Sequence, residues 1–137
     1  MVGPLHGLPI SLKDCMITPP HPSSIGMACY ANEATDEETV LVGVLARLGA
    51  VFYVKTNVPT AMMMMETVNV VWGETNGAYH CGTSCGGSSG GEGALLAMRG
   101  SPLGIGTDIG GSIRIPSAFN GLYGLKPRLG FLSFEDI

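Results

Sequence analysis

Two serine clusters embedded in glycine are the residues of this sequence best suited to carry out chemistry. The first is Gly-Gly-Ser-Ser-Gly-Gly at residues 86–91, and the second is Gly-Gly-Ser at residues 110–112. Glycine adopts backbone dihedrals that other residues resist, so this density indicates a tightly constrained loop or a backbone that approaches a ligand. A nucleotide-binding loop is one alternative, but the sequence has no GxxxxGK[ST] motif and no GxGxxG that opens a helix.

A serine hydrolase accounts for more of this pattern. Such an enzyme needs a nucleophilic hydroxyl, a proton acceptor, and backbone N–H groups directed at a developing oxyanion. The second cluster offers a hydroxyl and N–H donors at a turn between a strand and a helix. None of the three histidines lies in a context that marks it as the base, whereas a desolvated lysine can serve. Lowering the pKa of a lysine from about 10.4 to about 7 corresponds to roughly 4 to 5 kcal/mol and requires burial.

Short apolar runs predict the strands that position these residues. Residues 8–12 form a run of strand length that ends at Lys13, where burial of the amine is expected. Residues 103–105 form a second run, which leads into the glycine-rich segment 106–112. Residues 51–54 are expected to form a buried strand between them in the chain.

Helix signals alternate with these strands. Thr35 is suited to be an N-cap with Glu38 as its capping-box partner, and Gly49 is a plausible stop. The apolar stripe of that helix would consist of Val40, Val44, Leu45 and Leu48. Good helix formers at residues 94–98 follow the first serine cluster. The alternation predicts one α/β domain over residues 1–137, with a largely parallel or mixed sheet flanked by helices.

The composition is poor in charge. Charged residues make up 13% of the sequence, against about 25% in a typical soluble domain. This shortage of polar surface favours the interior part of a larger protein, or a small domain that forms oligomers. The methionines at residues 62–65 are expected to fill the core.

Several classes of function are disfavoured. The net charge is −4 and the seven basic residues are scattered, so nucleic acid is not an expected partner. The four cysteines form no CxxC pair, and His80, Cys81 and Cys85 fit no common zinc spacing. Reduced thiols indicate an intracellular, cytoplasmic protein, and association with a membrane stays open.

Three long segments resemble hallmark sequences of the amidase signature family. They read GLPISLKD at residues 7–14, GGSSGGEGAL at residues 86–95, and GTDIGGSIRIPSAFNGLYGLKP at residues 106–127. Residues 49–59 and 99–104 also match, so the resemblance covers nearly the whole chain. Within the family, the sequence is similar to the branch of fungal acetamidase-like enzymes and fatty acid amide hydrolases. The resemblance implies a partial amidase-signature fold, limited to an N-terminal portion of the catalytic core.

The resemblance also implies a site and a mechanism. Lys13 would be the general base, Ser88 a bridging serine preceded by a cis peptide, and Ser112 the nucleophile that becomes acylated. The oxyanion hole would be formed by the backbone N–H groups of Ile109, Gly110, Gly111 and Ser112. Ser89, Asp108 and Arg114 would support the site, the last two by fixing the turn through hydrogen bonds. A small carboxylic amide is the implied substrate, and no metal or cofactor is implied.

The sequence also departs from the family pattern. Residues 76–80 read Asn-Gly-Ala-Tyr-His where relatives usually have Asn-Pro, and Gly130-Phe131 replaces the usual Gly-Arg. The N-terminal helices and C-terminal half of the family's catalytic domain have no counterpart in this chain. A truncated non-catalytic fragment or a pseudoenzyme is therefore the alternative function. The chain alone is expected to self-associate through exposed apolar surface or sheet edges.

Overall fold

The computed structural model describes residues 2–133. Its main sheet has three parallel strands in the order β2-β1-β5, and a separate antiparallel pair joins β3 to β4. The strands are β1 Pro9–Lys13, β2 Val51–Thr56, β3 Val68–Asn69, β4 Gly73–Glu74 and β5 Gly104–Ile105. The α-helices are α1 Val40–Arg47, α2 Gly90–Ala97 and α3 Arg114–Phe119, and single turns of 3-10 helix lie at Ala28–Tyr30 and Thr60–Met62. All three predicted strands are thus present in the main sheet, and the predicted α/β class is confirmed.

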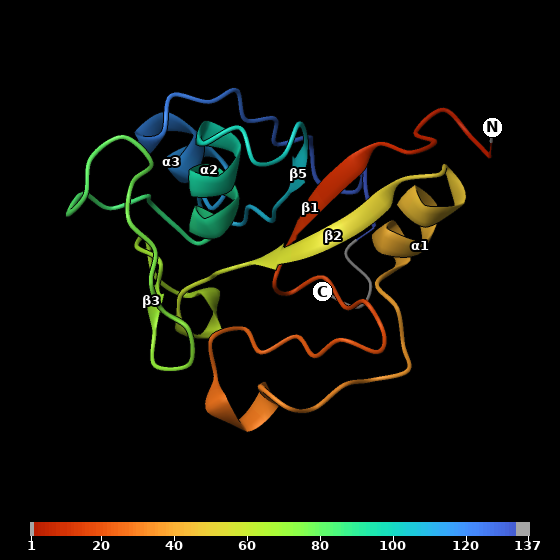
Figure 1. Cartoon of the computed structure of the whole chain (residues 1–137), viewed down its shortest axis with the longest axis horizontal. Helices are drawn as coiled ribbons and strands as arrows, with labels where there is room; N and C mark the ends of the chain where they lie inside the picture. The colour runs from red at the N-terminus through yellow and green to blue at the C-terminus, as the bar shows by residue number, and fades with distance from the viewer. Residues whose placement is uncertain (1, 134–137) are drawn as a thin grey trace.

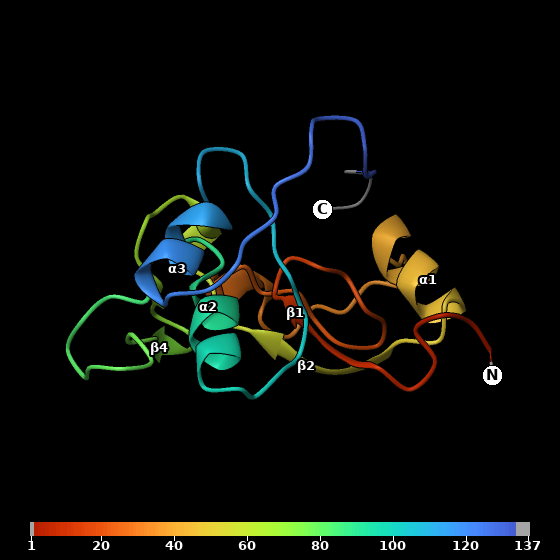
Figure 2. The ribbon, with the colours of Figure 1, turned by 90° about the horizontal axis from the view of Figure 1, so that it is seen from above.

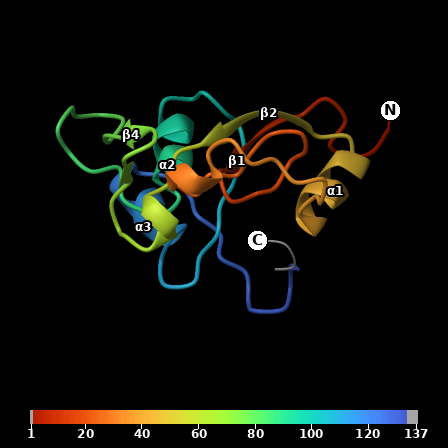
Figure 3. The same ribbon diagram turned by 90° about the horizontal axis from the view of Figure 1, so that it is seen from below.

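The helices lie at opposite ends of the molecule, with α2 and α3 at one end and α1 at the other (Figures 1, 2 and 3). Figure 1 shows β1 and β2 side by side, with their carboxyl ends directed toward the half that holds α2 and α3. Figures 2 and 3 show α1 at the opposite end, close to the N-terminus. The helix that follows the first serine cluster therefore lies where the central strand ends. No helix within residues 2–133 is long and apolar enough to cross a membrane.

The central strand separates an apolar core from a polar interior. Successive side chains of a strand point to opposite faces. Ile10 and Leu12 are buried on one face, where they form the core cluster with Met16 and Val42. Ser11 and Lys13 direct their side chains to the other face, where Ser11 contacts Glu92 of α2 and Lys13 contacts Ser88 just before that helix. A buried lysine is thus presented to the start of a helix by a strand that is buried from Ile10 onward.

Helix α1 begins later than the capping signal predicts. It starts at Val40, and Thr39 rather than Thr35 is its N-cap residue. The Thr35 hydroxyl donates instead to the carbonyl of Glu37. Two hydrogen bonds join Thr39 to Ile17. The Thr39 N–H donates to the Ile17 carbonyl, and the Ile17 N–H donates to the Thr39 hydroxyl. No helix forms over residues 35–38, so the capping-box prediction was wrong.

Three further predictions about burial were wrong. Val40 and Val44 are partly exposed, and Val42 is the α1 residue that enters the core. Strand β2 is present, but Val51 is 49% exposed because β2 is an edge strand with one bare face. The methionines at 63–65 lie on the surface rather than in the core, with Met63 at 84% exposure. All these side chains are apolar, so their sequence alone did not reveal which would stay uncovered.

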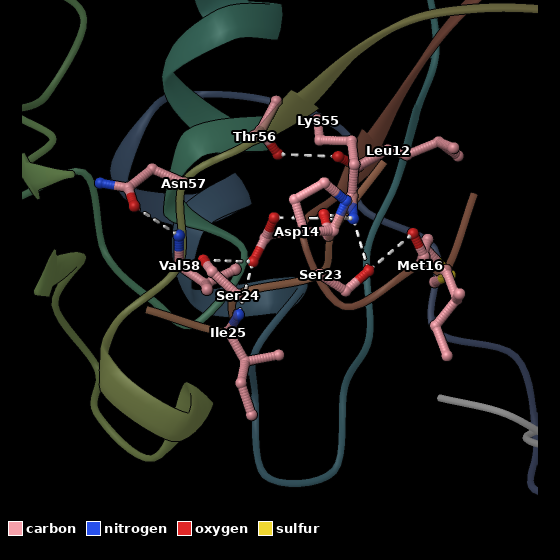
Figure 4. Close-up of polar contacts among 12 residues, drawn as sticks. Leu12, Asp14, Met16, Ser23, Ser24, Ile25, Lys55, Thr56, Asn57 and Val58 are labelled. Carbon is pink, nitrogen blue, oxygen red and sulfur yellow. Dashed lines mark hydrogen bonds and ion pairs between the residues drawn. The ribbon is translucent and has the colours of Figure 1, made fainter. Parts of the chain in front are cut away.

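A polar network fastens the loop after β1. The Lys55 ammonium donates to the Ser23 hydroxyl at 2.5 Å and lies 3.7 Å from a carboxylate oxygen of Asp14 (Figure 4). The other Asp14 oxygen accepts from the Ser24 hydroxyl at 3.0 Å and from the Ile25 N–H at 2.6 Å. Burial lowers the pKa of Lys55, and the Asp14 carboxylate opposes that shift. The network fixes the carboxyl end of β1, where the candidate base lies.

Candidate active site

Lys13 occupies the last position of β1 and has no exposed surface. Its Nζ lies 2.7 Å from the Ser88 hydroxyl and 2.6 Å from the Thr107 hydroxyl. Burial lowers the pKa of Lys13 from 10.5 to about 8, while the nearby Cys15, Asp108 and Glu92 act in the opposite direction. The amine therefore loses its proton much more readily than an exposed lysine.

Ser88 and Ser89 lie immediately before α2, and both are buried. The peptide bond between Gly87 and Ser88 is cis. A Cβ at Gly87 would lie 2.8 Å from the Met64 carbonyl oxygen, so the backbones pass each other too closely for a side chain. The Ser89 N–H donates to the carbonyl of Ser112 at 3.0 Å. This bond joins the two serine clusters through their backbones.

The turn that carries Ser112 is organised by one carboxylate. Asp108 is 5% exposed, and its Oδ1 accepts from the Gly111 N–H at 2.8 Å. Its Oδ2 accepts from the Ile113 N–H at 3.1 Å and from the Arg114 N–H at 3.2 Å. The Arg114 guanidinium donates to both oxygens, at 3.0 and 2.9 Å. These bonds hold the pKa of Asp108 far below its usual range, and the bonds from the Arg114 guanidinium have the largest effect.

The amides near Ser112 differ in their availability. The Gly111 N–H is already bound to Asp108. Within residues 2–133, the N–H groups of Ile109, Gly110 and Ser112 donate to no protein acceptor. Ile109 is 96% exposed, so this side of the turn is open. Of the four amides that the resemblance implies for an oxyanion hole, three are thus free to bind a ligand.

Of the three predicted catalytic residues, two are in direct contact and the third is not. Lys13 and Ser88 are in direct hydrogen-bond contact. The hydroxyl of Ser112 makes no hydrogen bond to Ser88 or to any other group in the part of the chain that is described. Ser89 contacts the backbone of Thr107 through its hydroxyl, at 3.3 Å to the carbonyl. The contacts between the two clusters therefore run through backbone groups.

Two polar residues at this site were missed by the sequence analysis. Thr107 binds the amine of Lys13, and it directly precedes Asp108 in the matched segment. Glu92 is buried in the first turn of α2, where its carboxyl accepts from the hydroxyls of Ser11 and Thr56. An acidic residue in a helix that otherwise consists of glycine, alanine and leucine was the available signal. No group of three His, Cys, Asp or Glu side chains within residues 2–133 is arranged to hold a metal ion.

Comparison with known proteins gives matches over the whole chain. The family model for amidases matches residues 1–137. An acetamidase of Emericella nidulans is 53% identical over 136 residues, which are 99% of this chain and 25% of that protein. Fatty-acid amide hydrolase 1 of Sus scrofa is 49% identical over 125 residues, which are 91% of this chain and 22% of that protein. The chain thus spans about a quarter of the length of these relatives.

Solved structures give the same result. A peptide amidase from Stenotrophomonas maltophilia matches with a TM-score of 0.93 and 34% identity, over 100% of this chain and 29% of that one. A fatty acid amide hydrolase matches with a TM-score of 0.84 and 42% identity, over 88% of this chain and 21% of that one. These matches confirm the predicted α/β fold class, and they show that this chain corresponds to part of a longer fold.

Proposed function

Since this chain belongs to the amidase family, we propose that it forms the catalytic part of an amide hydrolase that works through an acyl-serine intermediate. Neutral Lys13 takes a proton from Ser88, and Ser88 takes one from Ser112. The Ser112 oxygen then attacks the carbonyl carbon of a small carboxylic amide. When the tetrahedral intermediate collapses, the C–N bond breaks and the relay returns a proton to the leaving amine. Water then hydrolyses the acyl ester and frees Ser112.

The observation that carries this proposal is the contact between the buried Lys13 amine and the Ser88 hydroxyl, at 2.7 Å. A general base works best when its pKa lies near the operating pH. With a pKa of about 8, a useful fraction of Lys13 is neutral close to pH 7. An ordinary exposed lysine would be almost fully protonated there.

The turn around Ser112 supports the stabilisation of an oxyanion. The N–H groups of Ile109, Gly110 and Ser112 have no protein acceptor among residues 2–133, so they are available to an oxygen that gains negative charge. Gly111 contributes indirectly, because its N–H is bound to Asp108. In this proposal, Ser89, Asp108 and Arg114 hold the turn and the serine loop in place.

The test is labelling with a fluorophosphonate probe, which reacts with an activated serine. We expect one modified residue, Ser112, when the labelled chain is digested and analysed by mass spectrometry. Ser112→Ala should abolish labelling, whereas Ser89→Ala should leave a measurable rate because its N–H still binds the Ser112 carbonyl. Ser117→Ala is the matched control, since the Ser117 hydroxyl donates to the carbonyl of Ile113, the N-cap residue of its own helix. Equal labelling of Ser112→Ala and the unmodified chain would refute the proposal, and folded protein without labelling would favour a non-catalytic segment.

We also propose that the protein is intracellular. All four cysteines are free thiols, as in a reducing compartment.

The isolated chain is expected to self-associate. Strand β2 is an edge strand whose Val51 is 49% exposed, and Leu125 is 82% exposed. Such edges and patches recruit partners. Light scattering should give a mass above that of one chain, and Val51→Lys should reduce it while Thr35→Lys, on an exposed loop, should not. A monodisperse monomer would contradict this expectation.

A further inference from the structure

A buried carboxyl connects the helix after Ser88 to the strand that carries Lys13. Glu92 is 6% exposed. Its Oε2 accepts from the Ser11 hydroxyl of β1 and its Oε1 from the Thr56 hydroxyl of β2, both at 2.7 Å. A Cβ at Gly104 would lie 1.9 Å from Oε2, so the backbone of β5 closes the third side. The carboxyl therefore touches all three strands of the main sheet.

The same interior holds the amine of Lys13. Ser11 and Lys13 are two residues apart on one strand, so their side chains share a face. Ser11 binds Glu92, and Lys13 binds Ser88, which lies next to the N-terminal end of α2. The charge of Glu92 raises the pKa of Lys13, after the larger effects of Cys15 and Asp108, and the charge of Lys13 lowers the pKa of Glu92.

Few other charges face this interior. From β1 comes the Lys13 amine, with the Cys15 thiol just beyond the strand, and from the segment after β5 comes the Asp108 carboxylate. Strand β2 contributes the neutral hydroxyl of Thr56, and β5 contributes backbone. The negative charge of Asp108 is already matched by Arg114, at 2.9 Å. Glu92 forms no salt bridge within residues 2–133, so its charge is not already matched by another cation.

We propose that Glu92 is the buried countercharge of Lys13, and that it acts as a positioning residue which sets the protonation of the base without touching the substrate. This inference rests on the proposed function, since it assigns Lys13 the role of base. A negative charge on Glu92 stabilises the ammonium form of Lys13. A neutral residue of the same shape removes that stabilisation and makes the amine easier to deprotonate.

The titration of both groups supports this pairing. Burial raises the pKa of Glu92 from 4.5 to about 7, while the hydroxyls of Ser11 and Thr56 and the charge of Lys13 oppose the rise. Lys13 titrates at about 8. Between these two values both groups are mostly charged, Glu92 as a carboxylate and Lys13 as an ammonium. Above about pH 8 the amine becomes neutral and competent as a base.

A purely structural role for Glu92 makes a different prediction. In that case the carboxyl only clamps the strands through its two hydrogen bonds. Glu92→Gln preserves size, and its amide can still accept from one hydroxyl and donate to the other. If Glu92 only holds the strands together, this change leaves the pH dependence of the site unaltered. If Glu92 is a countercharge, the pH dependence of the site shifts.

The main experiment is the rate of fluorophosphonate labelling of Ser112 between pH 5 and pH 10. In Glu92→Gln the midpoint of the rise in rate should move to lower pH by about one unit, which raises the labelling rate at pH 6.5 several-fold. Glu74→Gln is the matched control, because Glu74 is exposed on β4, and it should keep the midpoint of the unmodified chain. An unchanged midpoint in Glu92→Gln would overturn the inference.

A second measurement needs no activity. NMR with glutamate labelled with ¹³C at the side-chain carboxyl reports the titration of Glu92 directly. We expect a midpoint near pH 7 in the unmodified chain and a higher midpoint in Lys13→Met, where the favourable cation is gone. If labelling fails in every variant but this shift occurs, the proposed function falls and the countercharge stands. A Glu92 midpoint near that of free glutamate, or one unmoved by Lys13→Met, would overturn the countercharge even where labelling succeeds.

Discussion

Replacing Lys13 by methionine is expected to slow the labelling of Ser112 by about 10²- to 10⁴-fold, the usual contribution of a general base. Methionine has similar length and is well suited to a buried apolar position. The Ser88 hydroxyl then loses the acceptor that lies 2.7 Å away. Lys126→Met is the matched control, because Lys126 is exposed and lies outside the site. A labelling rate within a few-fold of the unmodified chain would remove Lys13 from the relay.

The same substitution should change the pH dependence of stability in a defined direction. The pKa of Lys13 is about 8 in the folded chain and 10.5 in its ordinary state, so between these values the unfolded chain binds more protons. The free energy of unfolding therefore rises with pH across this window in the unmodified chain. Relative to Lys13→Met, the rise should approach about 3 kcal/mol. Urea unfolding of both chains at several pH values between 7.5 and 10.5 measures this difference.

The sequence located the central strand and its lysine correctly because the pattern there has one reading. The apolar run at residues 8–12 is short and ends in a charge, and β1 at Pro9–Lys13 reproduces it within one residue. The turn after β5 was equally legible, since three of the seven residues at 106–112 are glycine. The structure adds the detail that the Gly111 amide is bound by Asp108 and is not free.

The failures have a common physical origin in long-range contacts. Thr35 and Thr39 both satisfy the local rule for an N-cap, and the partner that decides between them is Ile17, in a distant loop. Met63 was expected in the core, yet its exposure depends on which surfaces lie opposite it. Glu92 and Thr107 acquire their roles only when α2 and the segment after β5 meet Lys13. Neither periodicity nor capping signals encode such meetings.

Replacing Asp108 by alanine should produce the largest loss of stability among the residues of the site. Asp108 is 5% exposed, and its carboxylate accepts from the N–H groups of Gly111, Ile113 and Arg114 as well as from the Arg114 guanidinium. Bonds to a charged group contribute about 1.5 to 3 kcal/mol each, and they are not additive. Because the Arg114 side chain is 58% exposed, water can solvate the guanidinium after the change. We therefore expect the free energy of unfolding to fall by about 3 kcal/mol.

The pH dependence and the controls make this last prediction specific. The pKa of Asp108 is held far below its usual range, with Arg114 as the leading cause. Its stabilisation should therefore be complete above about pH 4 and be lost as the pH falls further, because the unfolded carboxyl binds a proton first. Asp108→Ala should lack this acid-sensitive part of the stability, and it should also lose labelling of Ser112 because the turn is no longer fixed. Asp36→Ala, in an exposed loop, should match the unmodified chain in urea unfolding at pH 3 and pH 7. Equal unfolding curves for Asp108→Ala and Asp36→Ala would show that the carboxylate does not organise the turn around Ser112.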